Sequence, residues 1–207
     1  MTAPARSTDL YRARKGRVDL VDVPELLLVA VDGRGSPDGP DFAAAIQALY
    51  SVSSGAHSLL RKQDGAAPKG MPLEALWWVD DAEARDTFTA LATGAISVDD
   101  VDRALWRWQA LITQPEPITE AVLAEAVRSK TPALADRVQI SRWREGLAAQ
   151  ILHIGPYSTE GPSIVALHDG IAALGLRPRG RHHEIYLGDP RRGAPGKLRT
   201  LLRHPVE

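Results

Sequence analysis

The sequence predicts a single α+β domain made of two halves, each with the order strand, helix, strand, strand. Two observations predict this fold. Periodic segments follow one another in the same order twice along the chain, and each half holds one amphipathic helix between extended runs. With 207 residues, 44% of them hydrophobic, the chain can also bury a sizeable core. We therefore expect pseudo-two-fold symmetry, antiparallel sheets with the helices on one face, and a central groove where the halves meet.

The N-terminal region predicts an arm followed by strands. Residues 1–17 are polar and basic, which is typical of a flexible arm, so the domain itself is expected to span 18–207. A short strand is predicted at 18–23. Pro24 then breaks the pattern, and a stronger, apolar strand follows at 26–32.

The first half, about 26–113, continues with a helix and two strands. Apolar side chains at three- and four-residue spacing predict a helix over 42–60. Strands are predicted at 73–80 and 104–113. Between them, residues 81–105 form an insertion with short helical pieces that could serve as a lid.

A linking helix and the second half complete the chain. Thr119 is a predicted N-cap for a helix at about 119–130. The second half, about 147–204, repeats the first in pattern although the identity between the halves is low. Its predicted elements are a strand at 146–155, a helix at 163–175 ended by Gly175, and strands at 182–189 and 197–206.

Composition excludes several classes of function. The net charge is −1, so nothing indicates attraction to nucleic acid or to an anionic membrane. The absence of cysteine excludes disulfides and thiolate chemistry, and no run resembles a signal peptide or a membrane span. Phosphate-binding loops, dinucleotide fingerprints and the G-x-S-x-G motif are missing. We expect a cytoplasmic protein that needs no cofactor.

The run "LEALWWVDD", which begins at Leu73, carries an acid and two adjacent tryptophans. Alternation in a strand places Glu74 and Trp78 on one face and Trp77 on the other. Both faces therefore carry an indole. This indicates either a strand covered on both faces or a strand with one face on the core and the other on a groove. The expected groove favours the second interpretation.

Glu184 and Tyr186 form a second notable pair because they share one face of a predicted strand. A carboxylate on an otherwise apolar strand must be solvated, paired or used. It could pair with a nearby arginine, hold a cationic ligand among aromatic rings, or act as a general base on water. The neighbouring His182 and His183 point to opposite faces, which argues against a metal site.

Several runs resemble those of stand-alone GyrI-like small-molecule-binding domain proteins. They are "LVDVPELLLVAVDGRGSPDGPDFAAAIQALYSV", "MPLEALWWVDD", "LWRWQALITQPEPIT", "GLAAQILHIGPYSTEGPSI" and "HHEIYLGDPRR" with "KLRTLLRHPV". The resemblance covers nearly the whole chain from about Val18. It implies the effector-binding domain fold of multidrug-sensing regulators, with two such half-repeats around a ligand groove. In those relatives a groove glutamate, which matches Glu184 here, binds flat, aromatic, cationic ligands.

The resemblance also implies an activity. The branch that has the "LEALWW" and "HIGPYSTE" runs includes hydrolases that open the cyclopropane ring of DNA-alkylating spirocyclopropyl-dienone compounds. For this chain it implies Glu184 as general base, Tyr157 or Tyr186 as hydrogen-bond donor, and Glu74 as the symmetry-related alternative acid. The expected aromatic walls are Trp77 or Trp78 with Trp106 or Trp108. The alternatives are non-catalytic binding of aromatic or cationic drugs and a gyrase-inhibitor-type interaction module. A DNA-binding regulator is disfavoured, because no helix-turn-helix pattern precedes the domain.

Overall fold

The computed structural model describes residues 6–7, 9–80, 90, 95–96, 102–129, 135–188 and 194–207. Most of the insertion predicted at 81–105, with its helical pieces, lies outside these residues. The described α-helices are α1 (Pro40–Asp64), α3 (Glu120–Arg128) and α4 (Gly161–Ala173). The strands are β1 (Arg6–Ser7), β2 (Asp19–Arg34), β3 (Leu73–Trp78), β4 (Arg107–Thr113), β5 (Gln139–Ile154), β6 (His182–Tyr186) and β7 (Arg199–Pro205).

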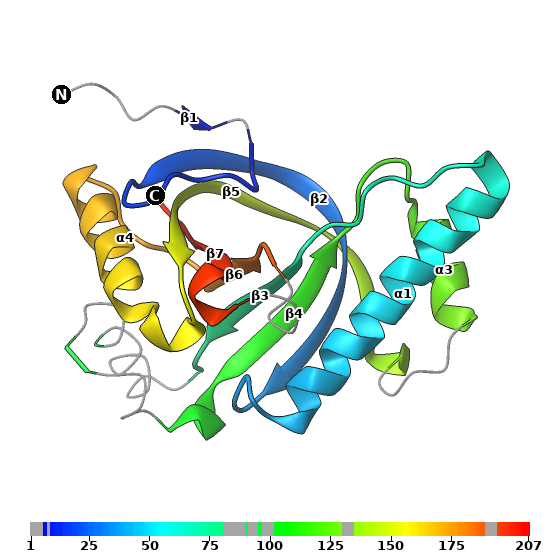
Figure 1. Ribbon diagram of the computed structural model, residues 1–207, viewed down its shortest axis with the longest axis horizontal. Coiled ribbons are helices and arrows are strands. Elements are labelled where there is room, and N and C mark those ends of the chain that lie inside the picture. Colours follow the sequence, from blue (N-terminus) through cyan, green and yellow to red (C-terminus); the bar gives the residue numbers. More distant parts are fainter. Residues whose placement is uncertain are drawn as a thin grey trace.

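The strands form one sheet that closes on itself. Its order is β1-β2-β4-β3-β6-β7-β5, and β2 also pairs with β5, so the six longer strands make a barrel-like ring (Figure 1). All pairings in this ring are antiparallel. The fold is therefore mixed α/β with an antiparallel sheet, as predicted. The expectation of separate sheets needs correction, because one closed sheet replaces them.

The length of β2 and β5 explains the closure. Each has 16 residues, so β2 can pair with β5 along Asp19–Ala30 and with β4 along Leu28–Arg34. The predicted break at Pro24 is wrong, because the strand continues through it. Val23 pairs with Gly146 and Glu25 with Arg144 on either side of Pro24, so the missing proline N–H interrupts the ladder only locally.

Local chemistry sets the helix ends. Pro40 lies in the first turn of α1 and Gly65 ends it in the left-handed conformation, with φ 75°. The Thr119 hydroxyl caps α3 by accepting from the Val122 N–H at 3.4 Å, which confirms the predicted cap. Gly175, with φ 71°, follows α4. From β2 onward, the described strands and α-helices read strand, helix, strand, strand before α3 and again after it. The pseudo-two-fold relation between these halves stays a prediction.

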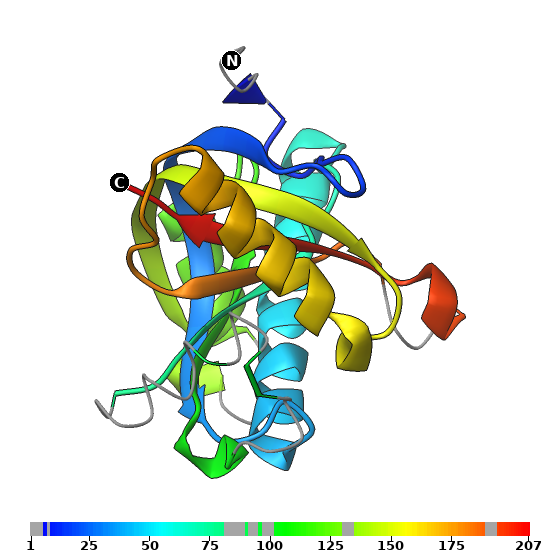
Figure 2. The ribbon, with the colours of Figure 1, turned by 90° about the vertical axis from the view of Figure 1, so that its left-hand side faces the viewer.

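All three helices cover the outer face of the closed sheet. Helices α1 and α3 pack on side chains of β2, β3 and β4 that include Val29, Trp77 and Ile112. Helix α4 packs on Ile151 and Leu202 from β5 and β7. In Figure 1 the first pair of helices lies at one side of the sheet and α4 at the other, and in Figure 2 α4 crosses in front of the strands. Strand β6 lies between the two covered regions.

The inner face of the sheet is filled by apolar and charged side chains and by the N-terminal segment. Ala13 and Tyr11 pack on Ile185 and Leu201. The backbone oxygens of Leu10 and Arg12 accept hydrogen bonds from Arg203 and Gln150. Residues 10–13 of the predicted arm thus lie against the sheet.

Candidate functional site

Glu184 and Tyr186 lie on the outer face of β6, as alternation predicts. The Tyr186 hydroxyl donates to Glu184 Oε2 at 2.7 Å, and the Glu184 side chain is 16% exposed. Burial and the Glu184 carboxylate raise the pKa of Tyr186 well above its ordinary value. The tyrosine therefore keeps its proton and holds the carboxylate in one orientation.

Neighbouring strands place further polar side chains on the same face. Trp77 of β3 lies directly across from His182, and Thr200 of β7 lies directly across from Tyr186. His182 Nε2 lies 3.5 Å from Glu184 Oε1. Trp77 Nε1, His182 Nε2 and Thr200 Oγ1 are buried and make no hydrogen bond of good geometry to any described residue. Because buried polar groups need partners, this face is suited to receive polar atoms of a bound molecule.

A second carboxyl group reaches this face from the start of α4. Glu160 is 5% exposed, and its Oε1 finds no hydrogen-bond partner among the described residues. Burial and the charge of Glu184 raise the pKa of Glu160 to about 9. Two carboxyl groups therefore meet here, one of which holds a proton at neutral pH. We call Trp77, Glu160, His182, Glu184, Tyr186 and Thr200 the β6 site.

Tyr157 stands at the edge of the β6 site. It begins the 3₁₀ turn Tyr157–Thr159 that leads into Glu160, and it is 40% exposed. Its ring meets that of Tyr186 edge-on, with 5.5 Å between centroids.

The tryptophans occupy different places. Trp77 is 3% exposed and packs on Phe42 and Trp106 with centroid distances of 5.3 and 5.7 Å. Trp108 is fully buried on β4, and β3 separates it from β6. Trp78 faces the other side of the sheet, where the Arg181 guanidinium stacks 3.5 Å from its ring centroid. Among the five described tryptophans, only Trp77 comes directly beside the residues of β6 on the outer face.

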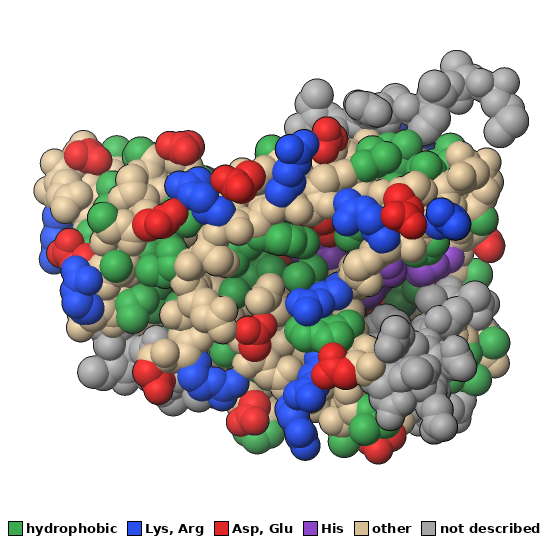
Figure 3. Space-filling view, turned by 180° about the vertical axis from the view of Figure 1, so that it is seen from behind, with side chains coloured by type: hydrophobic (Ala, Val, Ile, Leu, Met, Phe, Trp, Pro, Cys, Tyr) green, Lys and Arg blue, Asp and Glu red, His purple; other side chains and the backbone are tan. Residues whose placement is uncertain are grey.

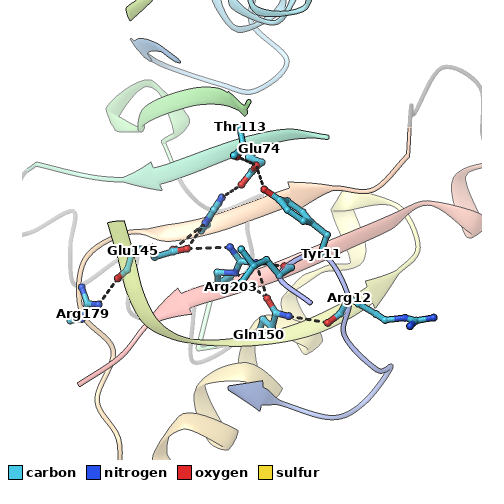
Figure 4. A network of polar contacts seen from close by, with 10 residues as sticks. Tyr11, Arg12, Glu74, Thr113, Glu145, Gln150, Arg179 and Arg203 are labelled. Atoms are coloured by element: carbon cyan, nitrogen blue, oxygen red, sulfur yellow. Dashed lines mark hydrogen bonds and ion pairs between the residues drawn. The ribbon is translucent and has the colours of Figure 1, made fainter. Parts of the chain in front are cut away.

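Glu74 lies on the inner face, away from Glu184. The register pairs Ala75 with Glu184 and Glu74 with Ile185. Its carboxylate accepts from Thr113 at 2.5 Å and Tyr11 at 3.2 Å, and lies 3.0 Å from His183 Nε2 (Figure 4). The structure therefore does not bring the two predicted acids together.

Comparison with known proteins shows the family of this chain. The family of the GyrI-like small molecule binding domain matches residues 17–207. The chain belongs to the GyrI-like family. The resemblance inferred from the sequence is thereby confirmed.

Solved structures give the same relationship. A conserved protein from Listeria innocua superposes with a TM-score of 0.79 at 32% identity, covering 94% of each chain. A hydrolase from Listeria innocua superposes with a TM-score of 0.73 at 30% identity, covering 95% of each chain. The C-terminal domain of EcmrR, at 12% identity and a TM-score of 0.53, covers 92% of this chain and 97% of its own and shares the fold alone. A search of curated proteins gave no match.

In this GyrI-like chain, sequence reasoning missed Glu160, His182 and Thr200 as members of the site. Glu160 ends the "HIGPYSTE" run from which Tyr157 was chosen, so the motif itself was the available signal. The sequence pattern at His182 indicates a polar strand entry as readily as a ligand, so it does not identify this residue as part of the site. Among the described residues, no group of three or more histidines and acids is placed to hold a metal ion. No described helix has the length and apolar character needed to cross a bilayer.

Three histidines of the GyrI-like domain gather beside the β6 site. His204 of β7 meets His168 of α4 at 5.2 Å and His182 at 6.1 Å between ring centroids. Figure 3 shows histidine side chains together at the edge of a hollow. Burial, with the proximity of His182 and His168, lowers the pKa of His204 to about 3. His204 is therefore neutral at physiological pH.

Proposed function

We propose that this GyrI-like protein hydrolyses spirocyclopropyl-dienone (cyclopropanoid) compounds, or similar electrophilic genotoxins, by adding water at the β6 site. The observation that carries the proposal is the Glu184 carboxylate, which is 16% exposed and oriented by the Tyr186 hydroxyl at 2.7 Å. A similar protein at 30% identity is a hydrolase, which supports catalysis of this general kind.

The chemistry suits these residues. The cyclopropane carbon of such a compound is electrophilic, because breaking its bond to the dienone ring restores an aromatic phenol. Glu184 accepts a proton from water as the water oxygen bonds to that carbon. The electrons of the broken carbon–carbon bond pass into the ring, and negative charge develops on the dienone oxygen. Tyr186 orients the base, while the 40% exposed Tyr157 offers aromatic surface to a flat substrate.

Timed incubation with a spirocyclopropyl-dienone compound, followed by mass spectrometry, tests this function. We expect the mass to increase by one water over many turnovers, in proportion to the protein added. Glu184→Gln keeps the shape of the side chain and removes its basicity, so turnover should fall about 100-fold or more. Affinity for a neutral aromatic ligand should remain. The exposed Glu125 of α3 provides the matched control, Glu125→Gln, which should behave like wild type.

A second candidate function is binding without turnover. A carboxylate beside the rings of Tyr186 and Tyr157 also suits an aromatic cation, which gains both charge pairing and cation–π attraction. In that case the dienone compound co-elutes unchanged with the protein. Glu184→Gln then weakens binding of a cationic dye much more than binding of its neutral analogue, as titration calorimetry would show.

A further inference from the structure

Glu160 has features that an ordinary helix-start glutamate does not need. Its side chain is 5% exposed, and its Oε1 has no hydrogen-bond partner among the described residues. It makes no cap hydrogen bond to α4 through its side chain. Instead its backbone oxygen accepts from the Ser163 and Ile164 N–H groups at 2.8 and 3.0 Å. The nearby Thr200 hydroxyl offsets only part of the rise in the pKa of this carboxyl group, and Oε1 is available to a bound molecule.

His153 braces the turn that carries Glu160. Its Nδ1 lies 3.0 Å from the Ser163 hydroxyl on one side of Glu160. Its Nε2 lies 3.3 Å from the Pro156 oxygen and 3.5 Å from the Thr159 hydroxyl on the other side. His153 itself is 5% exposed on β5. One buried ring therefore fixes the chain both before and after the carboxyl group.

The charges around Glu160 decide its protonation. Glu184 and Tyr186 of β6 and Thr200 of β7 interact with the Glu160 carboxyl group. His182 lies 3.5 Å from Glu184, and His153 of β5 contacts the turn on both sides of Glu160. Two carboxylates at such a site cannot both ionise without cost. Glu184 accepts a hydrogen bond from the Tyr186 hydroxyl at 2.7 Å and has His182 Nε2 at 3.5 Å, whereas the Oε1 atom of Glu160 has no such partner among the described residues.

We propose that Glu160 is the catalytic acid of the β6 site and donates its proton to the dienone oxygen while Glu184 takes a proton from water. The inference rests on the proposed hydrolysis. In the balanced step, the water oxygen bonds to the cyclopropane carbon, the carbon–carbon bond breaks, and its electron pair forms the aromatic ring. Glu184 ends protonated, Glu160 ends as the carboxylate, and the oxygen becomes a phenol. Proton exchange through solvent restores both groups.

Glu160→Gln tests the assignment, because the amide keeps the shape and a hydrogen-bond donor but cannot transfer a proton. We expect turnover of the spirocyclopropyl-dienone compound to fall about 100-fold or more, with binding retained. Wild-type turnover should decline as pH rises through about 9, where Glu160 loses its proton. That alkaline decline should vanish in Glu160→Gln and persist in the control Glu125→Gln. Turnover is expressed per folded molecule, because deprotonation of Glu160 and His183 also lowers the free energy of unfolding as pH rises to about 9.

Infrared difference spectroscopy at neutral pH gives a readout that does not depend on turnover. The spectrum of wild type minus Glu160→Gln should contain the carbonyl band of a protonated carboxylic acid. Absence of that band overturns the assignment. So does a Glu160→Gln variant with wild-type turnover and pH profile, and in that case the proposed hydrolysis still stands. If wild type binds the compound without hydrolysing it, the hydrolase function fails and the acid role fails with it.

Discussion

At the scale of single residues, the β6 site shows how environment separates two identical side chains. Glu184 and Glu160 are both glutamates on the outer face, and Glu184 accepts a hydrogen bond from the Tyr186 hydroxyl at 2.7 Å. Glu160 is more deeply buried and lies in the field of Glu184, which raises its pKa to about 9. The pair can thus supply a base and an acid at the same pH, which is the combination that water addition to a strained ring requires.

A glycine in β2 makes a sharper prediction about packing. Gly33 pairs with Trp108, whose indole ring lies where a Cβ on Gly33 would be. Trp108 is fully buried and meets Phe42 edge-on at 5.0 Å, so it has little room to move. Gly33→Ala should lower the free energy of unfolding by about 1–3 kcal/mol through overpacking. Urea denaturation measures the change, and Gly70→Ala, where a Cβ meets only open space, should unfold at nearly the wild-type concentration.

At the scale of elements, a buried charge network joins four strands and the N-terminal segment. His183 of β6 lies 3.1 Å from Glu145 of β5 and 3.0 Å from Glu74 of β3, while Arg203 of β7 lies 3.2 Å from Glu145 (Figure 4). Burial opposes a charge on His183, but Glu145 and Glu74 outweigh it and raise the pKa of His183 to about 9. This network fixes the register of β6 and therefore the position of the β6 site on the opposite face.

Two substitutions should show how much individual residues of this network contribute to the free energy of unfolding. Tyr11→Phe removes one of the contacts to Glu74, so it should cost about 1 kcal/mol of unfolding free energy. His183→Gln leaves the buried Glu74 without its cation, although Glu145 keeps Arg203 at 3.2 Å, so it should cost about 3–5 kcal/mol. Chemical denaturation at pH 6 would measure both. Equal losses for the two variants would contradict the view that His183 is the charged centre.

The elements also show how far the sequence could predict the site. Alternation correctly placed Glu184 with Tyr186, and Trp77 apart from Trp78. It could not predict the register between β3 and β6, in which Ala75 lies opposite Glu184. Since a shift of one residue reverses the face of every side chain, this register is what places Glu74 on the inner face. Closure of the sheet depends on the second pairing of β2, a long-range contact with no local pattern. Glu160 belongs to a turn, where neither strand nor helix periodicity indicates direction.

At the scale of the whole molecule, the buried titratable groups give the domain a defined pH range of stability. On the acid side, His204 resists protonation, because burial and the neighbouring histidines lower its pKa to about 3. Its stabilising effect is present above the ordinary value of 6.5 and is lost as pH falls toward 3. Glu145 also stabilises the fold less as pH falls. Its burial would raise its pKa, but His183 and Arg203 outweigh this effect and lower the pKa.

On the alkaline side, two groups act together. The folded state holds a proton on Glu160 from its ordinary pKa of 4.5 up to about 9, and one on His183 from 6.5 up to about 9. The unfolded chain releases both in those ranges, so the free energy of unfolding should fall as pH rises from 6.5 to 9 with a slope of two protons. Thermal unfolding across this range should show a steep decline of the wild-type free energy of unfolding with pH. Glu160→Gln should halve the slope of that free energy against pH, and the double variant with His183→Gln should remove most of the slope. Parallel curves for wild type and Glu160→Gln would mean that Glu160 is ionised in the folded protein, and the acid–base pair of the β6 site would have to be abandoned.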